Sequence, residues 1–192
     1  MYRIAIAGLV PAVLFSPVLA SAAPSRAAPV SPLQRIDTAK LPAGCRTLAR
    51  VPASARTSDP DFAAHLSVAS CMAETAMAGI ALSPDDAGIA ALNAAAAPSV
   101  TILDDVIAQG DPRWKLIAEE SLGDLDVGMM VRLRTVGSSD ANARAQLEPK
   151  LTPWRDHAEQ AFREVAAIAA AHTDLVNKDA VVASAIREAH AG

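Results

Sequence analysis

Four carboxylates stand close together in the segment EESLGDLD, residues 119–126. Paired carboxylates can perform general acid–base catalysis when burial raises the pKa of one of them. On a helix, however, the apolar residues from Trp114 to Met129 form one stripe, and all four acids project away from it. The acids are Glu119, Glu120, Asp124 and Asp126. We therefore expect a solvated outer face rather than a catalytic pair.

Arginine, histidine and tryptophan side chains offer the contacts best suited to a ligand. Arg132 falls among apolar stripe residues, where it must either pair with Asp104 or Asp105, reach water at the helix end, or bind an anion at a pocket mouth. His157 lies beside another apolar stripe, as a hydrogen-bonded core residue or as a ligand contact. The candidate small-molecule pocket comprises Arg132, His157, Trp114 and Trp154.

Motifs that would identify an enzyme or a metalloprotein are missing from the sequence. There is no HExxH zinc motif, no GxSxG elbow, no phosphate loop and no dinucleotide fingerprint. The four histidines are widely spaced. We expect no catalytic residues, no metal site and no cofactor, and we keep an enzyme that uses the outward acids as a third alternative only.

The two cysteines, Cys45 and Cys71, are the whole thiol inventory. In an exported chain the expected state is one disulfide, and two buried free thiols are the alternative. Closing a loop of this length would stabilise the fold by roughly 3.5 kcal/mol in the chain-entropy model. Their spacing does not fit a CxxC redox pair.

The first 22 residues have the layout of a secretory signal peptide. A positive start at Arg3 precedes an apolar run, and small residues then end at Ala22, after which we expect cleavage. An uncleaved membrane anchor is the alternative, and Pro11 and Pro17 argue against it. The sequence thus predicts a protein of the periplasm or the extracellular space, with a flexible Pro- and Ala-rich leader at 23–40 and a single domain at 41–192.

The mature chain is mildly acidic, with 16 basic against 21 acidic residues once residues 1–22 are removed. Nothing clusters into a basic patch, so neither nucleic acid nor an anionic lipid surface is an expected partner. We also expect no membrane insertion after signal cleavage.

The elements that would position these residues are helices. Each of four capping residues is followed by a proline, the arrangement that opens a helix: Asp59-Pro60, Ser83-Pro84, Asp111-Pro112 and Thr152-Pro153. The predicted helices span about 60–81, 83–107, 112–136 and 153–172, with a short terminal helix capped by Asn177. Pro98 predicts a kink or a break in the second helix.

The expected fold is all-α, with about five antiparallel helices in a bundle or a short helical-hairpin stack. Alanine, the best helix former, is abundant, and strand patterns are nearly absent. In the second half of the 112–136 helix, Val127, Met130 and Val131 lie opposite the main stripe. A helix that is apolar on both sides is expected to be a central one.

The capped helix pairs resemble tetratricopeptide-like helical-hairpin repeats. Leu122-Gly123 is similar to the Leu-Gly pair of the first helix of such a unit, and Ala158, Phe162 and Val165 are similar to positions of its second helix. The connection TVGSSDANARAQLEPKLTP is too long for the usual 34-residue period. The resemblance covers about a third of the chain. It implies a scaffold that binds other proteins through a groove and carries no catalytic residues.

Two functions fit these observations. The first is an exported, non-enzymatic α-helical protein that acts as an interaction module or accessory subunit, with another protein as its partner. The second is a small-molecule-binding bundle, with a pocket between the 112–136 and 153–172 helices. The second function requires that Arg132 and His157 converge on one cavity.

Overall fold

The chain folds into helices throughout the part that the structure describes. A computed structural model of the 192-residue chain describes residues 36–49, 59–109, 112–136 and 141–190. The predicted signal peptide and most of the predicted leader lie outside these residues. No strand occurs in the described ranges, so the expected all-α fold is confirmed.

Five helices of ten or more residues form the body of the molecule. They are α1 Asp59–Ala78, α2 Asp86–Ala108, α3 Pro112–Val136, α5 Thr152–Ala171 and α7 Ala180–Ala189. Shorter elements are the 3-10 helix η1 Ala43–Cys45, the helix α4 Ala141–Leu147, the 3-10 helix η3 Glu148–Leu151 and the helix α6 Thr173–Lys178. The predicted bounds of α3 agree with the structure, and those of α5 differ by one residue at each end.

Two of the predicted helix caps are replaced in the structure by nearby aspartates. The cap of α2 is Asp85, not Ser83: the backbone N–H of Gly88 donates to the Asp85 carboxylate at 3.0 Å, while the Ser83 hydroxyl donates to the same carboxylate at 2.6 Å. Likewise α7 is capped by Asp179 rather than Asn177, because the N–H groups of the first turn donate to its side chain. The sequence pattern located both helix starts to within a few residues. The aspartates act as the caps because their backbone is extended, which allows the side chain to accept from the first N–H groups of the helix.

Two other predicted caps are the first residues of their helices. Thr152 is the first residue of α5 rather than its cap, and no side-chain cap precedes it. Asp59 is likewise the first residue of α1, and Asp111 lies outside the described residues. Pro153 and Pro112 stand in the first turn of their helices as expected.

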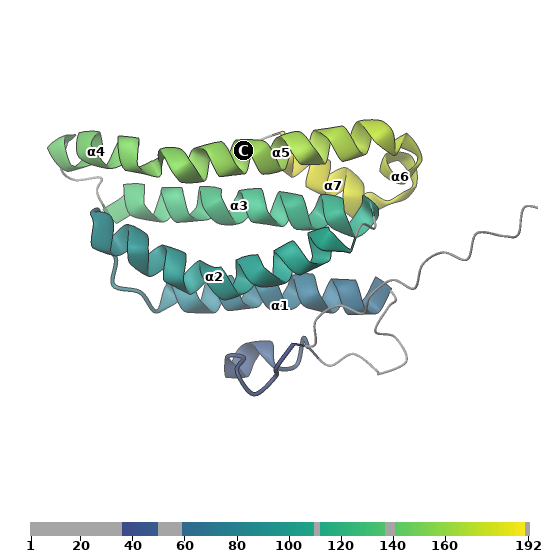
Figure 1. Ribbon diagram of the computed structural model, residues 1–192, viewed down its shortest axis with the longest axis horizontal. Helices are drawn as coiled ribbons and strands as arrows, with labels where there is room; N and C mark the ends of the chain where they lie inside the picture. The colour runs from purple at the N-terminus through teal and green to yellow at the C-terminus, as the bar shows by residue number, and fades with distance from the viewer. Residues whose placement is uncertain (1–35, 50–58, 110–111, 137–140, 191–192) are drawn as a thin grey trace, which may run out of the picture.

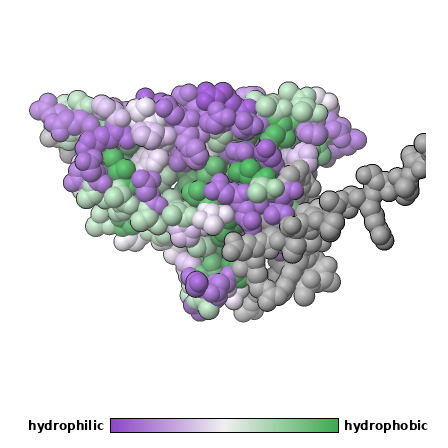
Figure 2. Space-filling model, in the orientation of Figure 1, coloured by the Kyte–Doolittle hydropathy of each residue, from purple (hydrophilic) through white to green (hydrophobic). Residues whose placement is uncertain are grey.

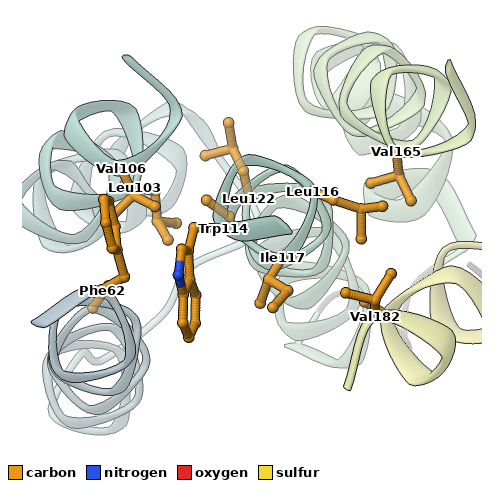
Figure 3. Packing of buried hydrophobic residues seen from close by; sticks show 12 residues of the cluster. Phe62, Leu103, Val106, Trp114, Leu116, Ile117, Leu122, Val165 and Val182 are labelled. Carbon is orange, nitrogen blue, oxygen red and sulfur yellow. The ribbon is translucent and has the colours of Figure 1, made fainter. Parts of the chain in front are cut away.

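Helix α3 is the central element. It packs against α2 and α5, and to a smaller extent against α7 and α1. Figure 1 shows α1, α2, α3 and α5 side by side, and the view along the helices in Figure 3 places α1 and α2 on one side of α3, with α5 and α7 on the other. The helix that the sequence predicted to be covered on both sides is thus the central one.

Buried side chains of α3 point in both directions. Trp114 stacks on Phe62 of α1 with ring centroids 5.7 Å apart, whereas Leu116 points toward Val165 of α5 and Val182 of α7 (Figure 3). A second apolar cluster continues along the C-terminal half of α3, where Leu133 is fully buried. Burial of this apolar surface on two sides is the main source of the fold's stability.

Helix α2 is continuous but bent. Pro98 lies inside it, and Figure 1 shows the ribbon curving in its middle. Proline lacks the N–H that would bond to the preceding turn, which is the usual cause of such a bend. Next to the bend, the Ser99 hydroxyl donates to the Ala69 carbonyl of α1 at 2.9 Å. By length and composition alone, α2 also meets the criterion for a membrane-crossing helix, a criterion that core helices of water-soluble proteins meet as well.

The predicted disulfide is confirmed. Cys45 and Cys71 are joined, with their Cα atoms 5.7 Å apart. The bond fastens the segment 36–49 to α1, where Leu41 and Val68 are buried beside it. This segment would otherwise contribute few apolar contacts, so the covalent link stabilises its position.

Candidate functional site

The two tryptophans of the predicted pocket lie in the core rather than in a ligand site. Trp114 is 5% exposed, and the guanidinium of Arg113 lies 4.2 Å from the centroid of its ring. Trp154 is 8% exposed, and its indole N–H donates to the side-chain oxygen of Asn93 at 2.9 Å. The aromatic faces and the indole N–H of Trp154 are therefore engaged within the protein.

Arg132 and His157 do not converge on one cavity. Arg132 is half-buried and lines a shallow groove with Met77 and Val131 at the C-terminal ends of α1 and α3, and it forms no ion pair within the described residues. His157 is half-exposed on α5, and its Nδ1 lies 2.5 Å from a carboxylate oxygen of Asp126. Neither pairing of Arg132 with Asp104 nor pairing with Asp105 occurs.

A cavity does lie between α3 and α5, the two helices that the sequence selected. It has a volume of about 290 Å³ and is lined by other residues: Val127, Met130, Arg134, Arg155, Ala158, Glu159 and Phe162. None of the four predicted pocket residues is among them. The sequence thus predicted the two helices that bound this cavity, but not the side chains that line it.

The expectation that the acids of α3 are solvated is wrong for three of the four. Glu119, Glu120 and Asp126 are only 9%, 6% and 4% exposed, while Asp124 is exposed. The face opposite the main apolar stripe is covered by α5 and α7, so leaving the stripe does not bring a side chain into water. The apolar residues Val127, Met130 and Val131 were the sequence signal that other helices cover this face of α3.

Burial changes the protonation of these carboxyl groups. Desolvation raises the pKa of Asp126, although the hydrogen bond with His157 opposes the rise. Desolvation also raises the pKa of Glu119, and nearby Lys115 partly offsets it. The charged form of a carboxyl group is costly in such surroundings unless a cation or a donor compensates it.

Among these carboxyl groups, Glu120 has the most strongly raised pKa. Its burial, followed by the neighbouring carboxyl groups of Asp124 and Glu188, raises its pKa to about 8. Oxygen atoms of these three side chains all lie within 4.8 Å of one another. Glu120 and Asp124 are four residues apart on α3, and Glu188 comes from α7, which packs on the N-terminal half of α3.

Glu120 and Asp124 also line a cavity, which we call the acidic groove. The groove has a volume of about 340 Å³ and runs between α1, α2 and α3. Its polar lining consists of Ser70, Glu74, Ser99, Glu120, Ser121 and Asp124, and its apolar lining of Ala69, Ala73, Met77, Leu103 and Leu125. With three carboxyl groups and no basic residue among these, the groove is suited to positively charged groups.

Two of the three serine hydroxyls that line the acidic groove, those of Ser99 and Ser121, are already engaged. Ser99 donates to the carbonyl of Ala69 at 2.9 Å, and Ser121 donates to the carbonyl of Ile117 at 2.8 Å. No histidine lines the groove to activate either of them. The groove thus offers carboxyl and hydroxyl groups for contacts with a ligand.

A smaller cavity of about 310 Å³ lies beneath the segment that the disulfide fastens. It is lined by Lys40, Asp37 and His65 among apolar residues of α1 and α2. His65 is buried, and its Nδ1 lies 2.8 Å from the Asp61 carbonyl oxygen in the preceding turn. We find no arrangement here that favours a particular chemistry.

The surface is divided between hydrophilic and hydrophobic regions. Figure 2 shows hydrophilic residues covering α5 on one face, with hydrophobic residues gathered below it over α3. No family model, no curated protein and no solved structure matches this chain. The fold and the site therefore define only a class: an all-α protein with an acidic groove between its first three long helices.

Proposed function

We propose that this chain is an exported, non-enzymatic α-helical protein that acts as an interaction module. The acidic groove is its binding surface, and its partner is another protein that inserts a lysine, an arginine or an amino terminus. The observation that carries the proposal is the groove itself, which places Glu74, Glu120 and Asp124 around an apolar floor. An apolar floor supplies affinity, and the carboxyl groups select for charge.

A further observation supports binding without catalysis. The Ser99 and Ser121 hydroxyls of the groove donate to backbone carbonyls, so their protons are already engaged within the protein. The resemblance to helical-hairpin repeats adds the expectation of a partner held in a groove. The disulfide agrees with export, because such bonds persist in oxidising compartments.

A pair of charge-reversal variants tests the groove. The tagged chain is used to capture partners from an envelope extract, in parallel with Glu74→Lys and, as a control, Asp156→Lys on the exposed side of α5. We expect a reproducible partner that Glu74→Lys loses and Asp156→Lys keeps. The proposal fails if no partner is reproducible or if both variants retain it equally.

Export has its own test. Intact mass measurement of the chain recovered from the exporting compartment should give a polypeptide that begins at residue 23 and lacks two hydrogens because of the disulfide. A chain that keeps residues 1–22 would contradict cleavage and favour the membrane anchor.

The second candidate function is small-molecule binding between α3 and α5. It is favoured by the cavity of about 290 Å³, close to the lower size limit of ligand pockets, and by its apolar wall of Val127, Met130 and Phe162. Arg134 at its mouth is bound bidentately to Glu148, with both distances 2.8 Å, so it has little capacity left for an anion. Native mass spectrometry of the purified chain should show an added small-molecule mass if this function is correct, and the bare polypeptide mass if it is not.

A further inference from the structure

Arg132 lies in an apolar groove that the proposed function does not use. The groove, which we call the Arg132 groove, has a volume of about 280 Å³ at the C-terminal ends of α1 and α3. Its larger apolar side chains are Met77, Ile80, Leu82, Val131 and Val136, and no other charged residue of the described chain lines it. Val131 and Val136 are 52% and 41% exposed. Exposed apolar side chains gathered in one groove mark a surface suited to contact with another molecule.

The guanidinium group of Arg132 has no counter-charge within the described residues. The side chain is half-buried, and the ion pairs of the described chain involve other arginines and lysines. A guanidinium group stays charged and presents five N–H donors in a fixed plane. Beside apolar side chains, it is placed to bind a carboxylate that another molecule brings.

The Arg132 groove and the acidic groove are parts of one furrow. Met77 of α1 lines both of them. On α3, Asp124 lines the acidic groove and Arg132 lines the other, two turns farther along the same face. Gly128 lies between these two residues, and a Cβ atom there would meet no neighbouring atom within 4 Å. The furrow is therefore open along α3, with carboxyl groups at one end and a guanidinium group at the other.

The shape of the furrow selects among occupants. The Arg132 groove is shallow and is smaller than the pockets of about 300–1,000 Å³ that enclose small molecules. A second copy of the chain would present the same concave surface, and two concave surfaces cannot pack closely against each other. A helix is convex, and an amphipathic helix that lays its apolar face in a groove is a common mode of protein recognition.

We propose that the furrow binds an amphipathic helix of a partner protein, with an acidic side chain at Arg132 and a basic side chain at Asp124. From Asp124 to Arg132, α3 rises by about 12 Å, which two side chains seven or eight positions apart on the partner helix span on one face. The dipole of that helix favours the acid toward its N-terminus, so it runs antiparallel to α3. The helix belongs to another protein, so the inference rests on the proposed function, to which it adds the second groove, the charge order and the direction.

A synthetic peptide tests the furrow. The matched peptide has about 18 residues, with leucines along one face, one glutamate near its N-terminus and one lysine two turns later. Its fluorescence anisotropy is measured against the purified full chain. We expect saturable binding that Arg132→Glu weakens at least about fivefold, because a repulsion replaces an attraction. The control is Arg163→Glu on the exposed side of α5, outside both grooves, which should leave binding within about twofold.

A second peptide and a second variant make the result specific. In the second peptide a lysine replaces the glutamate, and it should bind Arg132→Glu more tightly than it binds the parent chain. Val131→Ser removes apolar contact from the furrow and should weaken the matched peptide about threefold. Since Val131 is 52% exposed, this variant is expected to fold even if Arg132→Glu does not.

Four outcomes would overturn the inference. The first three are an absence of saturable binding, equal losses in Arg132→Glu and Arg163→Glu, and the same peptide preference in Arg132→Glu as in the parent chain. The fourth is a dimer, seen by sedimentation of the chain alone, that Arg132→Glu dissociates, because it would assign the furrow to a second copy.

Partner capture from the envelope extract separates this inference from the proposed function. A partner lost from Glu74→Lys, in a chain that does not bind the matched peptide, would support the proposed function and overturn the inference. Binding of the matched peptide by a chain that captures no partner would support the furrow while the proposed function fails.

Discussion

Gly123 lies at a close contact between α3 and α5, and replacing it with alanine should destabilise the protein. A Cβ atom at this position would lie 2.4 Å from Cε1 of Phe162, and 2.7 and 2.9 Å from two further ring atoms. Carbon atoms in contact are normally about 3.5–4.0 Å apart. The Phe162 ring or the whole of α5 must therefore move by about 1 Å, in the most extensive helix contact of the described chain.

Two opposing terms set the magnitude. Overpacking of a well-packed contact typically costs about 1–3 kcal/mol. Alanine in place of glycine inside a helix gains about 0.5–1 kcal/mol, because the unfolded backbone loses freedom. We expect Gly123→Ala to lower the free energy of unfolding by about 1–2 kcal/mol net.

Gly128 is the matched control on the same helix. A Cβ atom there meets no other atom within 4 Å, so only the backbone term remains. Gly128→Ala should raise the free energy of unfolding by about 0.5–1 kcal/mol. Urea denaturation followed by far-ultraviolet circular dichroism measures both variants against the parent chain.

A second substitution identifies the cause. Phe162→Leu removes the ring that the new methyl group would strike, so the cost of Gly123→Ala should be smaller in the Phe162→Leu background. If Gly123→Ala proved as stable as Gly128→Ala, or if its cost were unchanged by Phe162→Leu, the close contact would not be the cause and the reasoning would be refuted.

Three further predictions concern protonation and the disulfide. The pKa of Glu120 is raised from 4.5 to about 8, so between these pH values the folded chain keeps a proton that the unfolded chain releases. The free energy of unfolding therefore falls as pH rises through this window. At pH 8, Glu120→Gln should be more stable than the parent by roughly 2–4 kcal/mol, and below pH 4.5 the two should not differ; urea denaturation across pH measures this. His157→Ala leaves the buried carboxylate of Asp126 without its hydrogen bond. Because His157 is half-exposed, the free energy of unfolding should fall by about 1 kcal/mol at pH 7. The loss should be smaller at acid pH, where the carboxyl group is protonated, and thermal unfolding at both pH values measures it. Replacing both Cys45 and Cys71 with alanine should cost about 3.5 kcal/mol, and a loss below about 1 kcal/mol in urea denaturation would contradict a structural role for the bond.

Local pattern was sufficient for the long helices of this fold, but it did not predict the short helices α4 and α6. Proline in the first turn marked the beginnings of α3 and α5, because its missing N–H is not needed there. The apolar residues Val127 and Met130, opposite the main stripe, indicated that α3 is central. Two cysteines in a chain that we expect to be exported predicted their disulfide.

Helical periodicity was not sufficient for the candidate site. It showed which face of α3 carries Glu119, Glu120 and Asp126, but not whether another helix covers that face. It also grouped Arg132 and His157, which the structure places in different surroundings. The relevant quantity is the position of one helix on another, and this depends on packing over the whole molecule.

The sequence by itself thus determined the all-α class, the disulfide and the positions of the long helices to within a few residues, since backbone preferences and cysteine pairing leave local or compositional traces. Only the tertiary structure decided that α7 returns to α3 and brings Glu188 to Glu120 and Asp124. Residues that are so far apart along the chain share no spacing that a motif could record. Their meeting follows from the burial of Val182 and Ala185 against α3 and α5, which is a property of the assembled core.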